Sequence, residues 1–214
     1  MGYQINIGCG QKPTEGWINF DNSPAIKLAK SPLKIRLAKM LGLLTKLQIE
    51  NIEWLKKNTI EYADATTKIP LLDNSVITLY SSHMIEHLSR DGGVRFLQEV
   101  KRVLVSDGVV RILIPDLEKE VSRYNKEKNA DKFMESLTVA APPISSLIDK
   151  VRLIFSGYRH HQWMYDGDSL ANLMKSQGFR NVTIQISGNT LIENPGNLNL
   201  FEHEDISVAV EAKK

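Results

Sequence analysis

Two histidines and a glutamate near the middle of the chain have the spacing of a metal-binding motif. Residues 82–88 read SHMIEHL, so His83, Glu86 and His87 match H-x-x-E-H. In one class of zinc hydrolases, two histidines four residues apart on a helix bind the metal, and the glutamate acts as base. The first chemistry that the sequence suggests is therefore metal-assisted hydrolysis.

The position of this motif in the chain argues against that chemistry. The apolar run 76–82 reads as a β-strand that leads directly into the motif, so His83 is expected before the first helical turn. A metal site built on positions i and i+4 needs both histidines on one helix face, and a third ligand as well. No companion motif follows, so we expect no metal and keep a zinc hydrolase using His83, Glu86 and His87 as an alternative.

A glycine turn follows the first predicted strand, where INIGCGQ places Gly8 and Gly10. Glycine permits a tight turn and lets a ligand approach the backbone closely. The dinucleotide pattern G-x-G-x-x-G fails because Pro13 stands at its last position, and no G-K-[ST] completes a P-loop. A nicotinamide cofactor and a bound ATP are therefore disfavoured.

Acidic residues end the next two predicted strands. Asp21 closes WINFD and Asp64 closes TIEYAD. A carboxylate at the end of the second strand can accept hydrogen bonds from both hydroxyls of a ribose. Each aspartate alone could equally be a turn former or a helix cap. Together with the glycine turn, they predict a nucleoside site.

These residues need a parallel sheet to bring them together. Strands expected at 3–8, 17–21, 59–64, 76–82 and 108–116 alternate with helical segments. Among these are an amphipathic helix at 92–108 and a short helix at 167–179. Such alternation predicts an α/β fold with a doubly wound, mostly parallel seven-stranded sheet. The last two strands, 182–187 and 206–212, have only a loop between them and should pair antiparallel at one edge.

Taken together, four segments resemble the successive motifs of class I S-adenosylmethionine-dependent methyltransferases, in particular the bacterial type 11 group. These segments are INIGCG, WINFD, EYADATTKIPLLDNSVITLYSSHMIEHL and GVVRILIPD. The resemblance implies a Rossmann-like fold, S-adenosyl-L-methionine as cofactor and S-adenosyl-L-homocysteine as product. By position it implies that Gly8, Cys9 and Gly10 contact the methionine part, Asp21 the ribose, and Asp64 and Ala65 the adenine. Ser82 matches the end of the fourth strand, which lines the cofactor and the mouth of the substrate pocket. Asn6 departs from the family, which often has an acid there.

Two histidines are candidates for the acceptor side. The resemblance places His83 near the cofactor's methyl group, where a neutral histidine could act as base for a hydroxyl acceptor. It also places His161, in YRHHQWMYD, beside the substrate pocket. Both histidines also have a purely structural interpretation. His83 could be a histidine that packs and forms hydrogen bonds in the protein interior, and the segment around His161 could form an aromatic corner of the core.

Composition bounds the class of protein and its partners. The 214 residues include a single cysteine and carry a net charge of +2, so we expect a cytoplasmic protein without disulfides and without a nucleic-acid partner. No secretory signal or membrane-spanning run is present, so integral membrane association is not expected. The basic, leucine-rich segment 26–58 allows three interpretations: a lid over the acceptor, peripheral contact with an anionic surface, or a solvated amphipathic cover. Pro32 and Gly42 interrupt its apolar face, which favours the lid or the cover.

We therefore predict one methyltransferase domain over residues 1–214, with helical insertions at 26–58 and 116–160 that could close over the active site. The predicted reaction is methyl transfer to a small-molecule acceptor, with an oxygen or nitrogen nucleophile favoured over carbon. The alternative from another class is a catalytically silent scaffold or regulatory subunit that binds the same cofactor.

Overall fold

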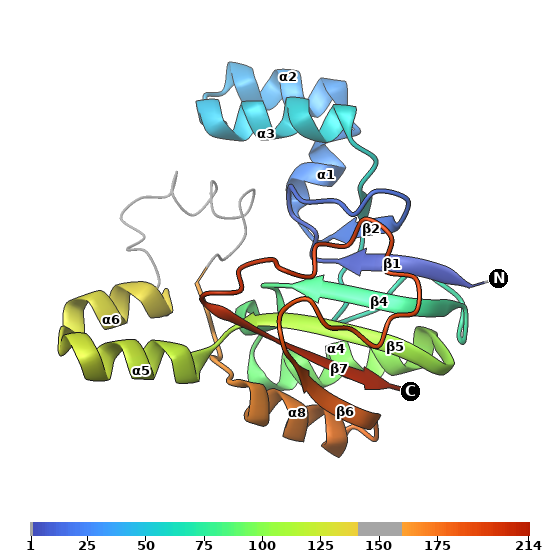
Figure 1. The fold of residues 1–214 in the computed structure, drawn as a ribbon. Coiled ribbons are helices and arrows are strands. Elements are labelled where there is room, and N and C mark those ends of the chain that lie inside the picture. The colour runs from blue at the N-terminus through green and yellow to red at the C-terminus, as the bar shows by residue number, and fades with distance from the viewer. Residues whose placement is uncertain (1, 141–159) are drawn as a thin grey trace.

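Seven strands form one sheet in a computed structural model that describes residues 2–140 and 160–214. The strand order is β3-β2-β1-β4-β5-β7-β6 (Figure 1). The strands are β1 (Tyr3–Ile7), β2 (Ile18–Asp21), β3 (Glu61–Tyr62), β4 (Val76–Ser82), β5 (Leu104–Pro115), β6 (Arg180–Gln185) and β7 (Ser207–Lys213). The predicted fold class is confirmed.

The pairing pattern places the reversal of strand order between β1 and β4. Both strands are parallel to each other and to their outer neighbours β2 and β5, and β3 continues the parallel half. β7 pairs antiparallel with β6, as the loop-only connection predicts, and also with β5. In such sheets the ligand binds at the carboxyl ends of the strands beside the reversal point.

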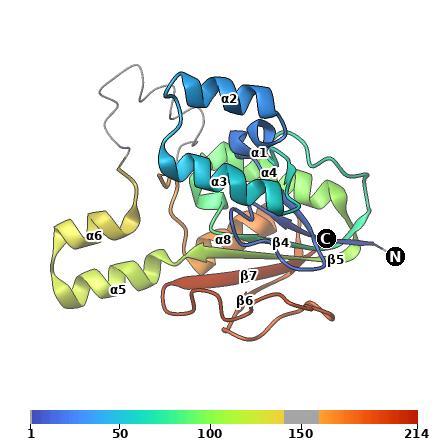
Figure 2. The ribbon, with the colours of Figure 1, turned by 90° about the horizontal axis from the view of Figure 1, so that it is seen from above.

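The two faces of the sheet are covered differently. Helices α4 (Arg90–Val103) and α8 (Gly167–Ser176) pack on one face, where Phe96, Leu97 and Met174 are fully buried in the main core. The β6–β7 loop lies over the opposite face, as Figures 1 and 2 both show. Its Ile192 and Leu198 pack with Trp17 in a second apolar cluster on that face.

A buried ion pair fixes this loop to the sheet. Arg111 of β5 and Glu211 of β7 form it at 2.7 Å, and their side chains are 2% and 0% exposed. Arg111 also donates to the carbonyl of Asn189, and Glu211 accepts from the Thr190 hydroxyl. The sheet centre thus holds the loop through charge-assisted hydrogen bonds.

The helical segments lie near the carboxyl ends of the parallel strands (Figure 1). Segment 26–58 contributes α1 (Pro24–Ala29), α2 (Pro32–Met40) and α3 (Lys46–Lys57), with breaks at Pro32 and Gly42 as predicted. Segment 116–160 contributes α5 (Leu117–Glu127) and α6 (Ala130–Leu137). The proline pair at 142–143 also predicts a helix break, and it lies outside the described residues. Among the described helices, none is long and apolar enough to cross a membrane.

Candidate active site

A tight turn at Gly8–Gly10 follows β1, the strand beside the reversal point. Gly8 and Gly10 have φ angles of +73° and +53°, in the left-handed region that favours glycine. A Cβ on Gly8 would lie 2.5 Å from Cγ of Met84, whereas one on Gly10 would meet no atom of the described residues within 4 Å. Gly8 is thus required by packing, and Gly10 leaves open space above the turn.

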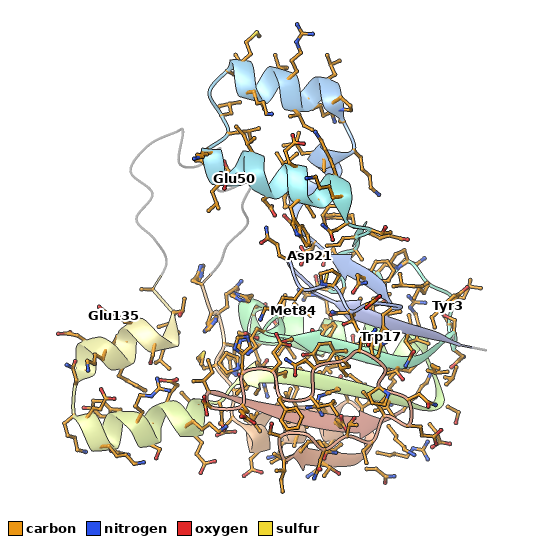
Figure 3. All side chains as sticks on the ribbon, turned by 45° about the horizontal axis from the view of Figure 1, so that its top comes forward. Tyr3, Trp17, Asp21, Glu50, Met84 and Glu135 are labelled. Atoms are coloured by element: carbon orange, nitrogen blue, oxygen red, sulfur yellow. The ribbon has the colours of Figure 1, made fainter. Side chains whose placement is uncertain are left out.

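The end of β2 is bonded directly to this turn. Oδ2 of Asp21 accepts a 3.0 Å hydrogen bond from the Gly10 N–H, and Oδ1 accepts a 2.8 Å bond from the Ser23 N–H. The amides of Gly8 and Cys9 both donate to the Phe20 carbonyl at 2.8 and 3.1 Å. Figure 3 shows Asp21 and Met84 together at the carboxyl edge of the sheet, with Tyr3 at the far end of β1.

Asp64 completes the row of strand ends. The preceding Ala63 donates to the Asp21 carbonyl at 3.1 Å, which fixes the β3 end beside the β2 end. Burial raises the pKa of Asp64, but the hydrogen bonds from Thr66 and Thr67 and the charge of Arg95 outweigh it, so the pKa lies below its ordinary value. Asp64 is therefore charged at neutral pH, next to the buried Ala65.

Asn6 at the end of β1 and Cys9 within the turn are both buried. Asn6, where the related family often has an acid, donates from Nδ2 to the Thr14 hydroxyl at 3.0 Å and so supports the loop after the turn. Burial, followed by the charge of Asp21, raises the pKa of the Cys9 thiol to about 12. Cys9 is therefore a neutral, buried thiol.

Ser82 and His83 stand at the end of β4, across the reversal point from the glycine turn. His83 has a left-handed φ of +48°, an uncommon conformation for a residue other than glycine. Its Nε2 lies 2.8 Å from the Ser207 hydroxyl and its Nδ1 lies 3.7 Å from Oε1 of Glu86. Burial, followed by the charge of His203, lowers the pKa of His83 to about 4, so the ring is neutral at pH 7.

A polar cluster from the β6–β7 loop, which no sequence motif indicates, reaches this position. Glu202 accepts from the Tyr80 hydroxyl at 2.6 Å and pairs with Lys12 at 2.9 Å. The ring of His203 lies 4.8 Å from that of His83. In the sequence this cluster corresponds to the polar run EHED at 202–205.

The H-x-x-E-H segment does not form the helix that a zinc hydrolase requires. Only Ile85–His87 is helical, as a single 3-10 turn labelled η1. The described residues with metal-ligand spacing are instead Glu86, His87 and His161, and His83 is not among them. The zinc alternative required His83 and His87 to bind the same metal ion. In the structure, His87 is grouped with Glu86 and His161 instead.

His161 approaches the site from the segment that precedes α8. The amides of Gln162 and Trp163 donate to the Glu86 carbonyl at 2.8 and 3.2 Å, which fastens this segment to η1. The rings of His161 and His87 have centroids 4.9 Å apart. The structure thus brings His83, Glu86, His87 and His161 into one group beside the reversal point.

The fold and the position of this site define a class I, Rossmann-like methyltransferase. A profile described as a methyltransferase domain matches residues 6–112, which is half of the chain. The chain therefore belongs to this family. It is a methyltransferase that uses S-adenosyl-L-methionine. No curated protein gives a significant match.

Solved structures show the same fold at low sequence identity. A SAM-dependent methyltransferase from Archaeoglobus fulgidus is 15% identical, with a TM-score of 0.52 over 100% of this chain and 86% of its own. A SAM-dependent methyltransferase, possible histamine N-methyltransferase, from Thermotoga maritima is 18% identical, with a TM-score of 0.51 over 100% and 83%. DhpI in complex with SAH is 7% identical, with a TM-score of 0.50 over 99% and 76%.

Proposed function

We propose that the cofactor lies across the carboxyl ends of β1, β2 and β3. The observation that carries this proposal is the direct bond between the Gly8–Gly10 turn and Asp21. In the proposed arrangement the turn and Cys9 support the methionine part, and Asp21 accepts hydrogen bonds from the ribose hydroxyls. Asp64 and the backbone at Ala65 bind the adenine, and Ser82 borders the methyl group.

The proposed acceptor is a small molecule with an oxygen or nitrogen nucleophile. Its lone pair forms a bond to the methyl carbon, the bond from that carbon to the sulfonium breaks, and the electron pair stays on sulfur. Alignment of the two reacting atoms supplies most of the rate enhancement. The neutral ring of His83 supports a role as acceptor of the proton that a hydroxyl or amine loses.

We further propose that the helical segments 26–58 and 116–160 cover the pocket as lids on a single domain. Segment 26–58 packs beside the cofactor turn, because Cys9, Ile26 and Ile60 share one apolar cluster. Gln11 of the turn also donates to the Asn51 side chain of α3 at 2.6 Å. His161, with the segment before α8, supports the acceptor side.

Segment 26–58 also supports the proposed peripheral contact with an anionic surface. Residues 24–57 hold eight basic and two acidic side chains, a net charge of +6 against +2 for the whole chain. Leu33 and Met40 of α2 are 77% and 75% exposed. A basic and apolar surface of this kind favours anionic lipid over zwitterionic lipid, which co-sedimentation with vesicles of each type would test.

The test of the catalytic proposal separates binding from turnover. His83→Ala should bind S-adenosyl-L-homocysteine with an affinity within threefold of wild type, measured by calorimetry. The rate of S-adenosyl-L-homocysteine formation is measured with a panel of hydroxyl and amine acceptors. For any acceptor that wild type methylates, this rate should be at least 100-fold lower in the variant. Equal turnover by the variant would make His83 a packing residue. Cofactor binding without turnover by wild type would fit the silent scaffold.

A further inference from the structure

Three potential metal ligands meet beside the proposed acceptor pocket. One ligand atom from each of Glu86, His87 and His161 lies within 4.8 Å of the others. Two of them come from η1 and the third from a segment more than 70 residues later. The backbone bonds from Gln162 and Trp163 to the Glu86 carbonyl hold these segments together, so the group is positioned without a ligand.

Glu86 is the member of this group whose burial needs an explanation. The residue is 0% exposed, and neither carboxylate oxygen has a hydrogen-bond partner among the described residues. A buried charged carboxylate is strongly unfavourable unless it is paired or coordinates a metal. A cation at this position would supply the missing counter-charge.

The two histidines already have the outer partners that metal-binding histidines require. Nδ1 of His87 lies 3.2 Å from the carbonyl of His160. The ring of His161 is hydrogen-bonded to the backbone at Leu137, and its buried Nδ1 has no partner among the described residues. Such second contacts orient an imidazole and fix its tautomer.

We propose that Glu86, His87 and His161 bind one divalent transition-metal ion. Two imidazoles and one carboxylate suit Zn²⁺ and its neighbours, whereas Mg²⁺ and Ca²⁺ prefer oxygen ligands alone. Tetrahedral coordination places ligand atoms about 3.3 Å apart, so rotation of the side chains must contract the group by about 1.5 Å.

Three protein ligands leave at least one coordination position for water or for an acceptor atom. Oε1 of Glu86 lies 3.7 Å from Nδ1 of His83, which places the group beside the proposed acceptor. A metal-bound hydroxyl acceptor would lose its proton more readily. Only this role rests on the proposed function; the metal site itself rests on the three ligands.

The test is a titration of the tag-free, full-length protein with Zn²⁺ after treatment with EDTA. Calorimetry should give one Zn²⁺ per chain, and Co²⁺ should give the absorption bands of a low-symmetry site. His161→Ala and the nearly isosteric Glu86→Gln should each weaken Zn²⁺ binding at least tenfold. His203→Ala is the matched control, because it removes a histidine outside the group and should bind Zn²⁺ as wild type does.

Two results would overturn the metal site: no stoichiometric Zn²⁺ binding by wild type, or unchanged binding by both His161→Ala and Glu86→Gln. Thermal melts of each variant show whether it is folded. Binding of S-adenosyl-L-homocysteine is measured on the same metal-free samples. Intact cofactor binding without Zn²⁺ binding rejects the metal site alone, whereas Zn²⁺ binding without cofactor binding rejects the proposed cofactor site alone.

Discussion

The N–H of Gly10 donates to the carboxylate of Asp21 at 3.0 Å, so the turn after β1 and the acid after β2 form one unit. These residues are separated by only ten others, with no helix between the two strands. The short connection explains how two neighbouring strand ends can present backbone and carboxylate groups to one nucleoside.

Asp21→Ala should weaken binding of S-adenosyl-L-homocysteine by about 10- to 100-fold. A hydrogen bond to a charged group contributes about 1.5–3 kcal/mol, so loss of the ribose contact alone accounts for a change of this size. Titration calorimetry measures the change. Asp205→Asn, an exposed acid of the β6–β7 loop, is the control and should leave the affinity unchanged. An unaltered affinity in Asp21→Ala would refute the ribose assignment.

Gly8→Ala and Gly10→Ala should differ in their effect on stability. Both residues have positive φ angles, which cost a substituted alanine about 1–2 kcal/mol. Only at Gly8 would the new Cβ lie 2.5 Å from Met84, so this variant should lose more free energy of unfolding in urea. Gly10→Ala should instead lose mainly cofactor affinity. Equal destabilisation of both variants would argue against the packing difference.

Cys9 should react slowly with alkylating reagents in the folded protein. Its thiol has a pKa of about 12, so the thiolate forms only at higher pH than in an ordinary cysteine. At pH 8 we expect modification by iodoacetamide at least 100-fold slower than in the denatured chain, with the rate still rising at pH 10. Because Cys9 is the only cysteine, mass spectrometry follows this reaction directly. A plateau in the native rate near pH 9 would contradict the burial of the thiol.

Arg111→Met should lower the free energy of unfolding by about 3–5 kcal/mol, because Glu211 is then left as a buried, uncompensated charge. Urea denaturation measures this loss. Adding Glu211→Gln removes the charge while keeping an acceptor for Thr190, and should recover about 1–2 kcal/mol. A double variant less stable than Arg111→Met would show that the ion pair is not the source of the effect.

The sheet and its order of elements could be predicted because local patterns determine them. Apolar runs such as 76–82 and the amphipathic spacing of α4 depend on neighbouring residues alone. Pro32 and Gly42 likewise mark the helix breaks in 26–58 through their own backbone preferences. These features need no knowledge of tertiary contacts.

The surroundings of the histidines could not be predicted, because they depend on residues distant in the chain. His83 contacts Ser207 and His203 from the β6–β7 loop, which the sequence showed only as a connection. The H-x-x-E-H pattern suggested a ligand pair within one helix, but His87 meets His161 through a contact across 74 residues. Hydrogen bonds to the Glu86 carbonyl create that contact, and no spacing rule describes them.

The most direct test of the cofactor site is a crystal structure of the protein with S-adenosyl-L-homocysteine. We expect the homocysteine part on the Gly8–Gly10 turn, the ribose hydroxyls within hydrogen-bond distance of the Asp21 carboxylate, and the adenine beside Asp64 and Ala65. The sulfur should face His83. A ligand bound away from the carboxyl ends of β1 and β2, or with its ribose turned away from Asp21, would contradict the account.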